Sequence, residues 1–212
     1  MRDFSKRLPV EPPSSKVGIH TGPNFLQSIL AALNAHDAYT YRHSVRTVRL
    51  SLTLARAYGL DGEQLRTLCL GALLHDVGKV CIPEAVLHKP EPLSALEWAV
   101  VQRHPQQGAA LLRNVPSIAG AVLVVAEHHE RWDGTGYPKG LAGTKIDLNA
   151  RIVAVADAYD AMTSARAYRP ARLYEAAMTE LARCAGTQFD PLVVTAFGAI
   201  PRACIEAAAR QA

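Results

Sequence analysis

The sequence contains no long apolar run. Its most apolar stretch, IAGAVLVVA at residues 118–126, is less than half as long as the roughly 20 residues that a membrane-spanning helix requires. The chain also does not open with the basic and apolar segments typical of a secretory signal. These absences argue against a membrane span and against export, so we expect a cytoplasmic protein.

Cysteine is scarce and scattered. None of the four cysteines, at positions 69, 81, 184 and 204, belongs to a CxxC pair, which argues against a disulfide framework and against a zinc ribbon. We expect reduced and mostly buried thiols. The net charge of +4 is mild, and the sequence has no basic run of the kind that binds duplex DNA. An anionic small ligand remains compatible with this charge.

What is present indicates one helical domain. The 212 residues, 49% hydrophobic and 20% charged, are typical of a globular chain with one substantial core. Residues 1–22 hold three prolines and lack apolar periodicity, which favours an extended leader or linker. Beyond them, apolar residues recur with helical spacing and no segment alternates as a strand would, so we predict a single all-α domain over residues 23–212. Helices are expected near residues 106–114, 117–131, 149–163, 171–184 and 190–199.

Several residues mark expected helix ends. Asp61 is a predicted N-cap, and Gly78 a predicted stop, for the helix carrying Leu65, Leu68 and Ala72. SALE at Ser94–Glu97 matches a capping box. Asp37 is expected to cap the following helix rather than to act chemically.

A glycine-rich loop, WDGTGYPKGLAGTK at residues 132–145, interrupts the helical pattern. Loops of this length inside compact helical proteins are uncommon and are either functional or mobile. An ordinary connector is the alternative, and composition alone does not choose between them.

The histidines are the strongest chemical signal. His75 and Asp76 directly follow the apolar run that begins at Leu70, where burying an imidazole and a carboxylate costs several kcal/mol unless each finds a partner. A second pair, His128–His129, falls near the end of another predicted helix. A single helical histidine is more often a satisfied core or surface residue, but together with acids these positions indicate a metal centre. Imidazoles and carboxylates without thiolates favour Fe, Mn, Co, Ni or Zn.

The motifs HSVRTV, LLHDVGK, RHPQQG, HHERWDGTGYP and VADAYDAMTSARAYR, in this order, resemble those of the HD-GYP phosphodiesterases from about Asn34 to Ile200. The resemblance implies an all-helical domain of the HD superfamily that hydrolyses cyclic di-GMP. The implied product is pGpG, with slower cleavage to GMP, formed at a binuclear metal site with a bridging hydroxide. Fe or Mn is the expected metal, with Ni, Co and Zn as alternatives. Diguanylate cyclases, docking on the GYP loop, are the protein partners that the resemblance suggests.

The resemblance also implies roles for individual residues. One metal would be held by His43, His75, Asp76 and Asp157, and Asp76 would bridge to a second held by His104, His128 and His129. The catalytic residues would be Asp76 and Lys79, with Lys79 contacting the scissile phosphate. Asp160, which shares a helix face with Asp157, would accept a hydrogen bond from behind the metal ligands. The GYP loop would be Gly136, Tyr137 and Pro138, and substrate would be bound by Lys79, Tyr137, Arg166 and Arg169.

One departure from the family pattern has a chemical consequence. Tyr39 stands four residues before His43, where members with three metals carry a glutamate, so we expect two ions here. The departures at Glu91, Pro92, Asp147 and Ala167 leave the implied ligands untouched.

Two other functions stay open. The chain could be a cyclic dinucleotide receptor or protein-interaction module without turnover, or an HD hydrolase acting on another cyclic dinucleotide. The complete set of implied ligands, together with Lys79, favours the enzyme.

Overall fold

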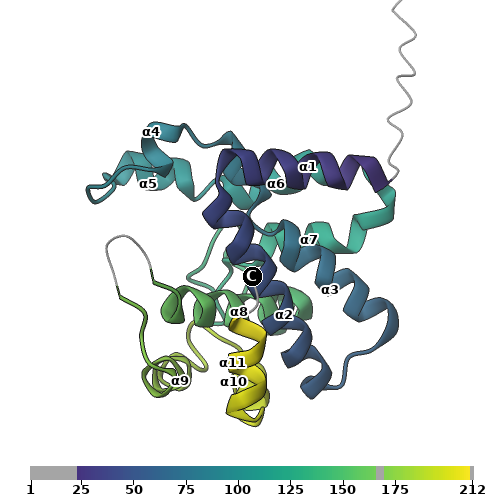
Figure 1. Ribbon diagram of the computed structural model, residues 1–212, viewed down its shortest axis with the longest axis vertical. Coiled ribbons are helices and arrows are strands. Elements are labelled where there is room, and N and C mark those ends of the chain that lie inside the picture. The colour runs from purple at the N-terminus through teal and green to yellow at the C-terminus, as the bar shows by residue number, and fades with distance from the viewer. Residues whose placement is uncertain (1–22, 166–169, 211–212) are drawn as a thin grey trace, which may run out of the picture.

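Helices account for every regular element in residues 23–165 and 170–210, which the computed structural model describes (Figure 1). Within these ranges no strand forms, and the sheet-like pairing is limited to two isolated bridges. The all-α prediction is therefore confirmed, while the predicted leader lies outside the described residues. The helices are α1 (Pro23–His36), α2 (Ala38–Tyr58), α3 (Gly62–Leu74), α4 (Glu84–Leu87), α5 (Ala95–Val101), α6 (His104–Leu112), α7 (Ala119–Glu127), α8 (Leu148–Thr163), α9 (Tyr174–Arg183), α10 (Pro191–Gly198) and α11 (Arg202–Arg210), with 3-10 turns η1 (Val77–Cys81), η2 (Pro116–Ile118) and η3 (Gly143–Lys145).

The ends of α2 follow from local chemistry. The Asp37 side chain accepts hydrogen bonds from the backbone N–H groups of Tyr39 and Thr40, at 2.9 and 3.2 Å, so this predicted cap is confirmed. At the other end Gly59 adopts a left-handed φ of 97°, which glycine tolerates and which terminates the helix. The cap fixes the first turn of α2, and His43 lies on the second turn.

The predicted stop at Gly78 is wrong. Helix α3 ends at Leu74, His75 is its C-cap, and the chain continues into η1. Gly78 serves a different purpose, because a Cβ atom there would lie 2.0 Å from the backbone oxygen of His104. Glycine is therefore needed where η1 passes against α6, and this close approach brings Asp76 beside His104.

Other predicted boundaries are mostly close to the observed ones. The capping box is confirmed, since Ser94 and Glu97 exchange side-chain and backbone hydrogen bonds. Asp61 occupies the N-cap of α3 but makes no side-chain cap hydrogen bond. Helix α7 ends at Glu127, four residues before the predicted end, because the chain turns at the histidine pair. Helix α11 was not expected.

Two groups of buried apolar side chains hold the helices together. The larger group joins α2, α3 and α8 to the C-terminal helices and includes Leu50, Leu54, Leu68, Ile152, Tyr159, Leu181, Phe197 and Ile205. The smaller group joins the end of α3 to η1, α6 and α7, and includes Leu74, Val77, Leu112 and Val125. Burying one such side chain fully contributes about 1.5–3 kcal/mol. Because His75 and Asp76 lie between Leu74 and Val77 in the chain, the smaller core fixes their position.

The four cysteines form no disulfide within the described ranges. Only Cys184 is buried, whereas Cys81 and Cys204 are exposed, so the expectation of mostly buried thiols is wrong.

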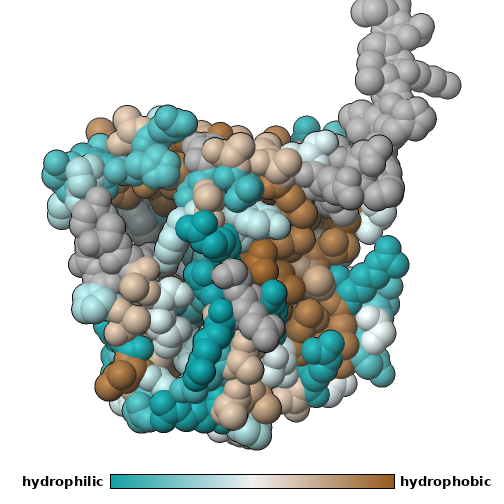
Figure 2. Space-filling view, viewed as in Figure 1, coloured by the Kyte–Doolittle hydropathy of each residue, from teal (hydrophilic) through white to brown (hydrophobic). Residues whose placement is uncertain are grey.

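The face drawn in Figure 2 is unevenly polar. Hydrophobic side chains gather in the region of α3 and α7, and hydrophilic ones cover much of the lower part. Among the described helices, none by itself combines the length and apolar character needed to cross a membrane. Only α10 and α11 taken together pass that test, and the chain bends by 97° between them.

Candidate metal centre

Three histidine rings are oriented in the same way. Each ring Nδ1 lies close to the carbonyl oxygen three residues earlier: His75 with Ala72 at 2.7 Å, His104 with Val101 at 2.8 Å, and His128 with Val125 at 2.9 Å. A carbonyl oxygen can only accept, so Nδ1 carries the proton in each ring. The lone pair is then on Nε2, which is the arrangement of a histidine prepared to bind a metal.

The side chains converge in two groups of possible metal ligands. Within each group, one nitrogen or oxygen atom per residue lies within 4.8 Å of all the others. One group is Asp76, His104, His128 and His129, and the other is His43, His75 and Asp157. These are the seven residues predicted as metal ligands, although their coordination of a metal remains a prediction.

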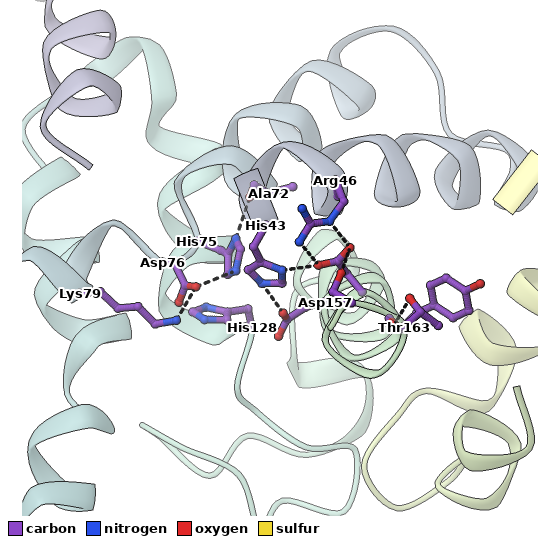
Figure 3. A network of polar contacts seen from close by, with 12 residues as sticks. His43, Arg46, Ala72, His75, Asp76, Lys79, His128, Asp157 and Thr163 are labelled. Carbon is purple, nitrogen blue, oxygen red and sulfur yellow. Dashed lines mark hydrogen bonds and ion pairs between the residues drawn. The ribbon is translucent and has the colours of Figure 1, made fainter. Parts of the chain in front are cut away.

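Asp76 belongs to the first group and also contacts the second. Its Oδ1 is 3.3 Å from Nε2 of His104. Its Oδ2 is 3.3 Å from Nε2 of His75, as Figure 3 shows. The two oxygens therefore face different groups, as a bridging carboxylate requires. Lys79 Nζ also lies 2.6 Å from Oδ2. Burial opposes ionisation, but the positive charge of Lys79 holds the pKa of Asp76 well below its usual range.

His43 links the second group to a buried ion pair. Its Nε2 is 2.8 Å from Asp157 Oδ1, and its Nδ1 is 2.6 Å from Asp160 Oδ2. Arg46 in turn donates to both oxygens of Asp160, at 2.7 and 3.0 Å. Asp160 thus lies behind His43 and holds its ring, while its predicted role behind metal ligands stays a prediction.

Protonation differs between the two groups. Burial and the neighbouring imidazoles lower the pKa of His128, and burial lowers that of His129 to about 4, so both rings are neutral. For His43, burial opposes protonation, yet hydrogen bonds to Asp157 and Asp160 raise its pKa to about 9. A cation bound at His43 and Asp157 would therefore replace a proton.

The arrangement fits a divalent cation. Nε2 of His104 and Nε2 of His128 lie 3.3 Å apart. When Nδ1 is the protonated nitrogen in both rings, both Nε2 atoms carry lone pairs. Two lone pairs at this distance repel one another, and a cation between or beside the two atoms would offset that repulsion. Nε2 of His75 is buried without a hydrogen bond in the described structure. Nitrogen and carboxylate donors at these positions suit a first-row divalent metal.

A cleft of about 370 Å³ opens beside these groups. His128, His129 and Asp157 contribute to its wall, so a ligand in the cleft would reach both groups. The Tyr137 ring lies over that of His129, with centroids 4.9 Å apart, and also lines the cleft. A Cβ on Gly136 would lie 2.3 Å from the backbone nitrogen of Arg131, so the GYP loop folds closely over its own start.

Other predicted site residues are placed as follows. A quarter of the Lys79 side chain is exposed, which leaves it accessible at the edge of the centre. Arg166 and Arg169 lie outside the described residues, so their predicted binding of phosphate stays a prediction.

Comparison with known proteins agrees with this geometry. A family model described as HD domain matches residues 27–193, which is most of the chain. The chain belongs to the HD-domain family. That match falls inside the predicted domain 23–212 and covers every residue of both ligand groups.

Individual relatives show which members of the HD-domain family this chain is similar to. It is 44% identical to a cyclic di-GMP phosphodiesterase of Pseudomonas aeruginosa, over 82% of this chain and 42% of the relative. It is 36% identical to a 3'3'-cGAMP-specific phosphodiesterase of Vibrio cholerae, over 82% of this chain and 34% of the relative. The chain thus spans less than half the length of these relatives. An HD-GYP protein from Bdellovibrio bacteriovorus shares its fold, with a TM-score of 0.60 at 24% identity over 82% of this chain and 58% of that one. The resemblance to HD-GYP phosphodiesterases is confirmed.

Sequence reasoning missed three charged residues of this HD domain. Arg46, three residues after His43, could have been found from helical spacing alone. Glu127 and Glu130 flank the histidine pair and are buried, at 5% and 4% exposed. Glu127 accepts from the Asp147 backbone N–H at 3.0 Å, and Glu130 holds the middle of the glycine-rich loop. Buried glutamates directly before a glycine-rich loop are a signal for such anchoring.

We expect Glu130→Ala to loosen the loop of this HD domain. Glu130 Oε1 and Oε2 accept hydrogen bonds from the backbone N–H groups of Lys139 and Leu141, at 2.6 and 2.9 Å. Hydrogen bonds to a charged group contribute about 1.5–3 kcal/mol each. The variant should lose about 3–6 kcal/mol of unfolding free energy in urea titrations and be cut faster by protease within the loop. Glu91→Ala is the control, because Glu91 is exposed and makes no hydrogen bond in the described ranges. Equal stability of both variants would contradict the anchoring role.

Proposed function

We propose that this HD domain hydrolyses cyclic di-GMP to pGpG, with slower further cleavage to GMP. The observation that carries the proposal is the pair of ligand groups, with Asp76 contacting both, beside a cleft of about 370 Å³. The name of the Pseudomonas aeruginosa relative supports the same substrate. Two divalent cations, Fe or Mn, would be held by these groups and would supply Lewis acidity and activation of water when bound.

Residues of the chain itself would support the reaction in three ways. His128 and His129 stay neutral because of burial, so they can bind a metal without first losing a proton. Arg46 and Asp160 orient the His43 ring, which keeps its Nε2 directed at the centre. Lys79 is held against Asp76 and would place a positive charge beside a phosphoryl oxygen of the substrate, where negative charge increases during the reaction.

The test is a product assay with purified, metal-loaded protein. Cyclic di-GMP, 3'3'-cGAMP and cyclic di-AMP are offered separately, and products are separated by chromatography. Conversion of cyclic di-GMP to pGpG, lost on chelation, is expected. Tight binding of cyclic di-GMP without product would instead support a receptor.

A second candidate is hydrolysis of a mixed guanine–adenine dinucleotide. The Vibrio cholerae relative, named as specific for 3'3'-cGAMP, is the observation that favours it. Turnover of 3'3'-cGAMP alone in the same assay would establish this candidate in place of the first.

We further propose that the centre holds two ions and not three. Tyr39 lies one helical turn before His43, and a phenol is a poorer ligand for these metals than a carboxylate. Asp37 does not replace the missing carboxylate, because its two oxygens accept hydrogen bonds from Tyr39 and Thr40.

Tyr39→Glu is therefore expected to raise the metal content from two ions per chain to three. The matched control is Tyr41→Glu, which sets the same side chain about 200° around the helix from position 39 and should leave the content at two. Elemental analysis of loaded and desalted protein gives the count. Three ions in the unmodified protein, or no gain in the Tyr39→Glu variant, would contradict the proposal.

A further inference from the structure

Arg131 is the one arginine or lysine among the described residues that line the cleft. About a third of its side chain, 34%, is exposed. It follows the histidine pair by two positions and belongs to neither ligand group. Arg131 is therefore a positive charge in the cleft that the proposed binding of metal leaves without a role.

The guanidinium of Arg131 is held from one side. Its Nε donates to Thr135 Oγ1 at 2.9 Å and to Asp133 Oδ1 at 3.3 Å, and its Nη2 donates to Asp133 Oδ2 at 3.1 Å. These hydrogen bonds from Arg131 and Thr135 lower the pKa of Asp133 to about 2, so its carboxylate stays charged at neutral pH. Within the described ranges Nη1 makes no hydrogen bond. The edge formed by Nη1 and the second N–H of Nη2 is therefore available to a ligand, in an orientation that Asp133 fixes.

The surroundings of Arg131 suit a base. The Trp132 N–H donates to the Gln188 carbonyl at 3.2 Å, so Arg131 and Phe189 lie on either side of one backbone hydrogen bond. Phe189 and two alanines of α8 form the apolar part of the cleft wall. An apolar surface can cover the flat face of a base, whereas a phosphate placed against it would lose hydration without gaining hydrogen bonds. In the proposed function the scissile phosphate lies at the ligand groups, which leaves this wall for a base.

The free edge of the guanidinium distinguishes the two purines. It offers only donors, and guanine presents two neighbouring acceptors, O6 and N7. Adenine presents an amino donor beside N7, so one donor of the arginine would face another donor. Gln102 and Gln188 also line the cleft, but an amide both donates and accepts and therefore matches either purine. A preference for guanine can thus come from Arg131 and not from the glutamines.

We propose that Arg131 binds the O6 and N7 edge of one guanine of the substrate and sets the preference for guanine over adenine. Asp133 is then a positioning residue that holds the guanidinium for this contact. The inference rests on the proposed function, because it assumes a cyclic dinucleotide in the cleft.

The experiment pairs Arg131→Met with a change in the substrate. Values of kcat/KM are measured for cyclic di-GMP and for the analogue in which C–H replaces N7 of both guanines. Both dinucleotides carry the same phosphates, so a contact to phosphate does not distinguish them. The unmodified protein should lose about 10- to 150-fold on the analogue, the range for a hydrogen bond to a charged group. Arg131→Met should lose at least as much on cyclic di-GMP, and in this variant the analogue should cost little more.

Two further measurements on the same preparations separate the base contact from other roles. Metal content should be equal in the unmodified protein and in Arg131→Met, because Arg131 belongs to neither ligand group. The affinity for cyclic di-AMP, measured as a competitor of turnover, should not fall in the variant. If the unmodified protein acts only on 3'3'-cGAMP, the same comparison is made with that dinucleotide and its analogue.

Arg183→Met is the matched control. Arg183 donates Nε and Nη2 to the Glu180 carboxylate, at 3.0 and 2.6 Å, in the way that Arg131 donates to Asp133, but it lies outside the cleft. Its replacement should leave every rate unchanged. An equal loss on the analogue in the unmodified protein and in Arg131→Met, or an equal fall in affinity for both dinucleotides, would overturn the contact with guanine. Failure of the unmodified protein to hydrolyse any cyclic dinucleotide would overturn the proposed function and this inference with it.

Discussion

Asp76→Asn is expected to abolish metal-dependent hydrolysis and to lower metal content while the helices remain folded. The carboxylate has one oxygen toward each ligand group, at 3.3 Å from His75 and from His104. Asparagine keeps the shape but lacks the charge, so two cations at short range would repel one another without the bridge. Loss of partners behind metal ligands already costs about 10–100-fold in affinity or activity, and loss of a shared ligand should exceed that.

The readouts are turnover, elemental analysis and thermal unfolding. Asp61→Asn is the matched control, since Asp61 is exposed and makes no side-chain cap hydrogen bond. It should retain full activity and full metal content. Normal turnover with full metal content in the Asp76→Asn variant would show that the site is assigned wrongly.

Gly78→Ala should damage both the fold and the centre. The added Cβ would lie 2.0 Å from the His104 oxygen and 2.6 Å from the Gly108 nitrogen, both backbone atoms that cannot rotate away. Inserting a methyl group into such a contact typically costs about 1–3 kcal/mol, occasionally more. Because the displaced segment carries Asp76 and Lys79, metal affinity and turnover should fall together with stability.

Gly198→Ala separates this effect from the general consequences of replacing a glycine. A Cβ at position 198 would have Met178 Cε as its nearest neighbour, at 3.9 Å, so there is room for it. Urea titration and elemental analysis of both variants provide the comparison. Equal stability and equal metal content in the two variants would contradict the role given to the contact between η1 and α6.

Periodicity and capping chemistry predicted much of the fold. Helix α8 begins one residue before its predicted range of 149–163 and ends with it, because its buried face repeats with regular helical spacing. The caps at Asp37 and Ser94 depend only on residues within four positions, so the sequence contains all the information they need. The residues of the candidate site were named from the sequence because its motifs resemble those of the HD-GYP phosphodiesterases, and their roles stay predictions.

The features that the sequence did not predict depend on contacts between segments that are far apart in the chain. Gly78 is explained by the position of His104, which no local pattern reveals. Gln102 and Gln188 belong to no sequence motif, and only the fold shows that both line the same cleft. The anchoring of the loop by Glu130 likewise depends on the loop folding back onto it. The bonded residues, Lys139 and Leu141, are 9 and 11 positions further along the chain.

The separation in sequence between His43 and Asp160 is 117 positions, although their side chains touch. His43 and Asp157 are 114 positions apart, so a cation bound by both would work as a reversible cross-link across more than half of the chain. Closing so long a segment costs conformational entropy in the unfolded chain, and a ligand that binds only the assembled site shifts the balance toward the native state. Metal supply would then control how much of the protein is folded as well as how much of it is active.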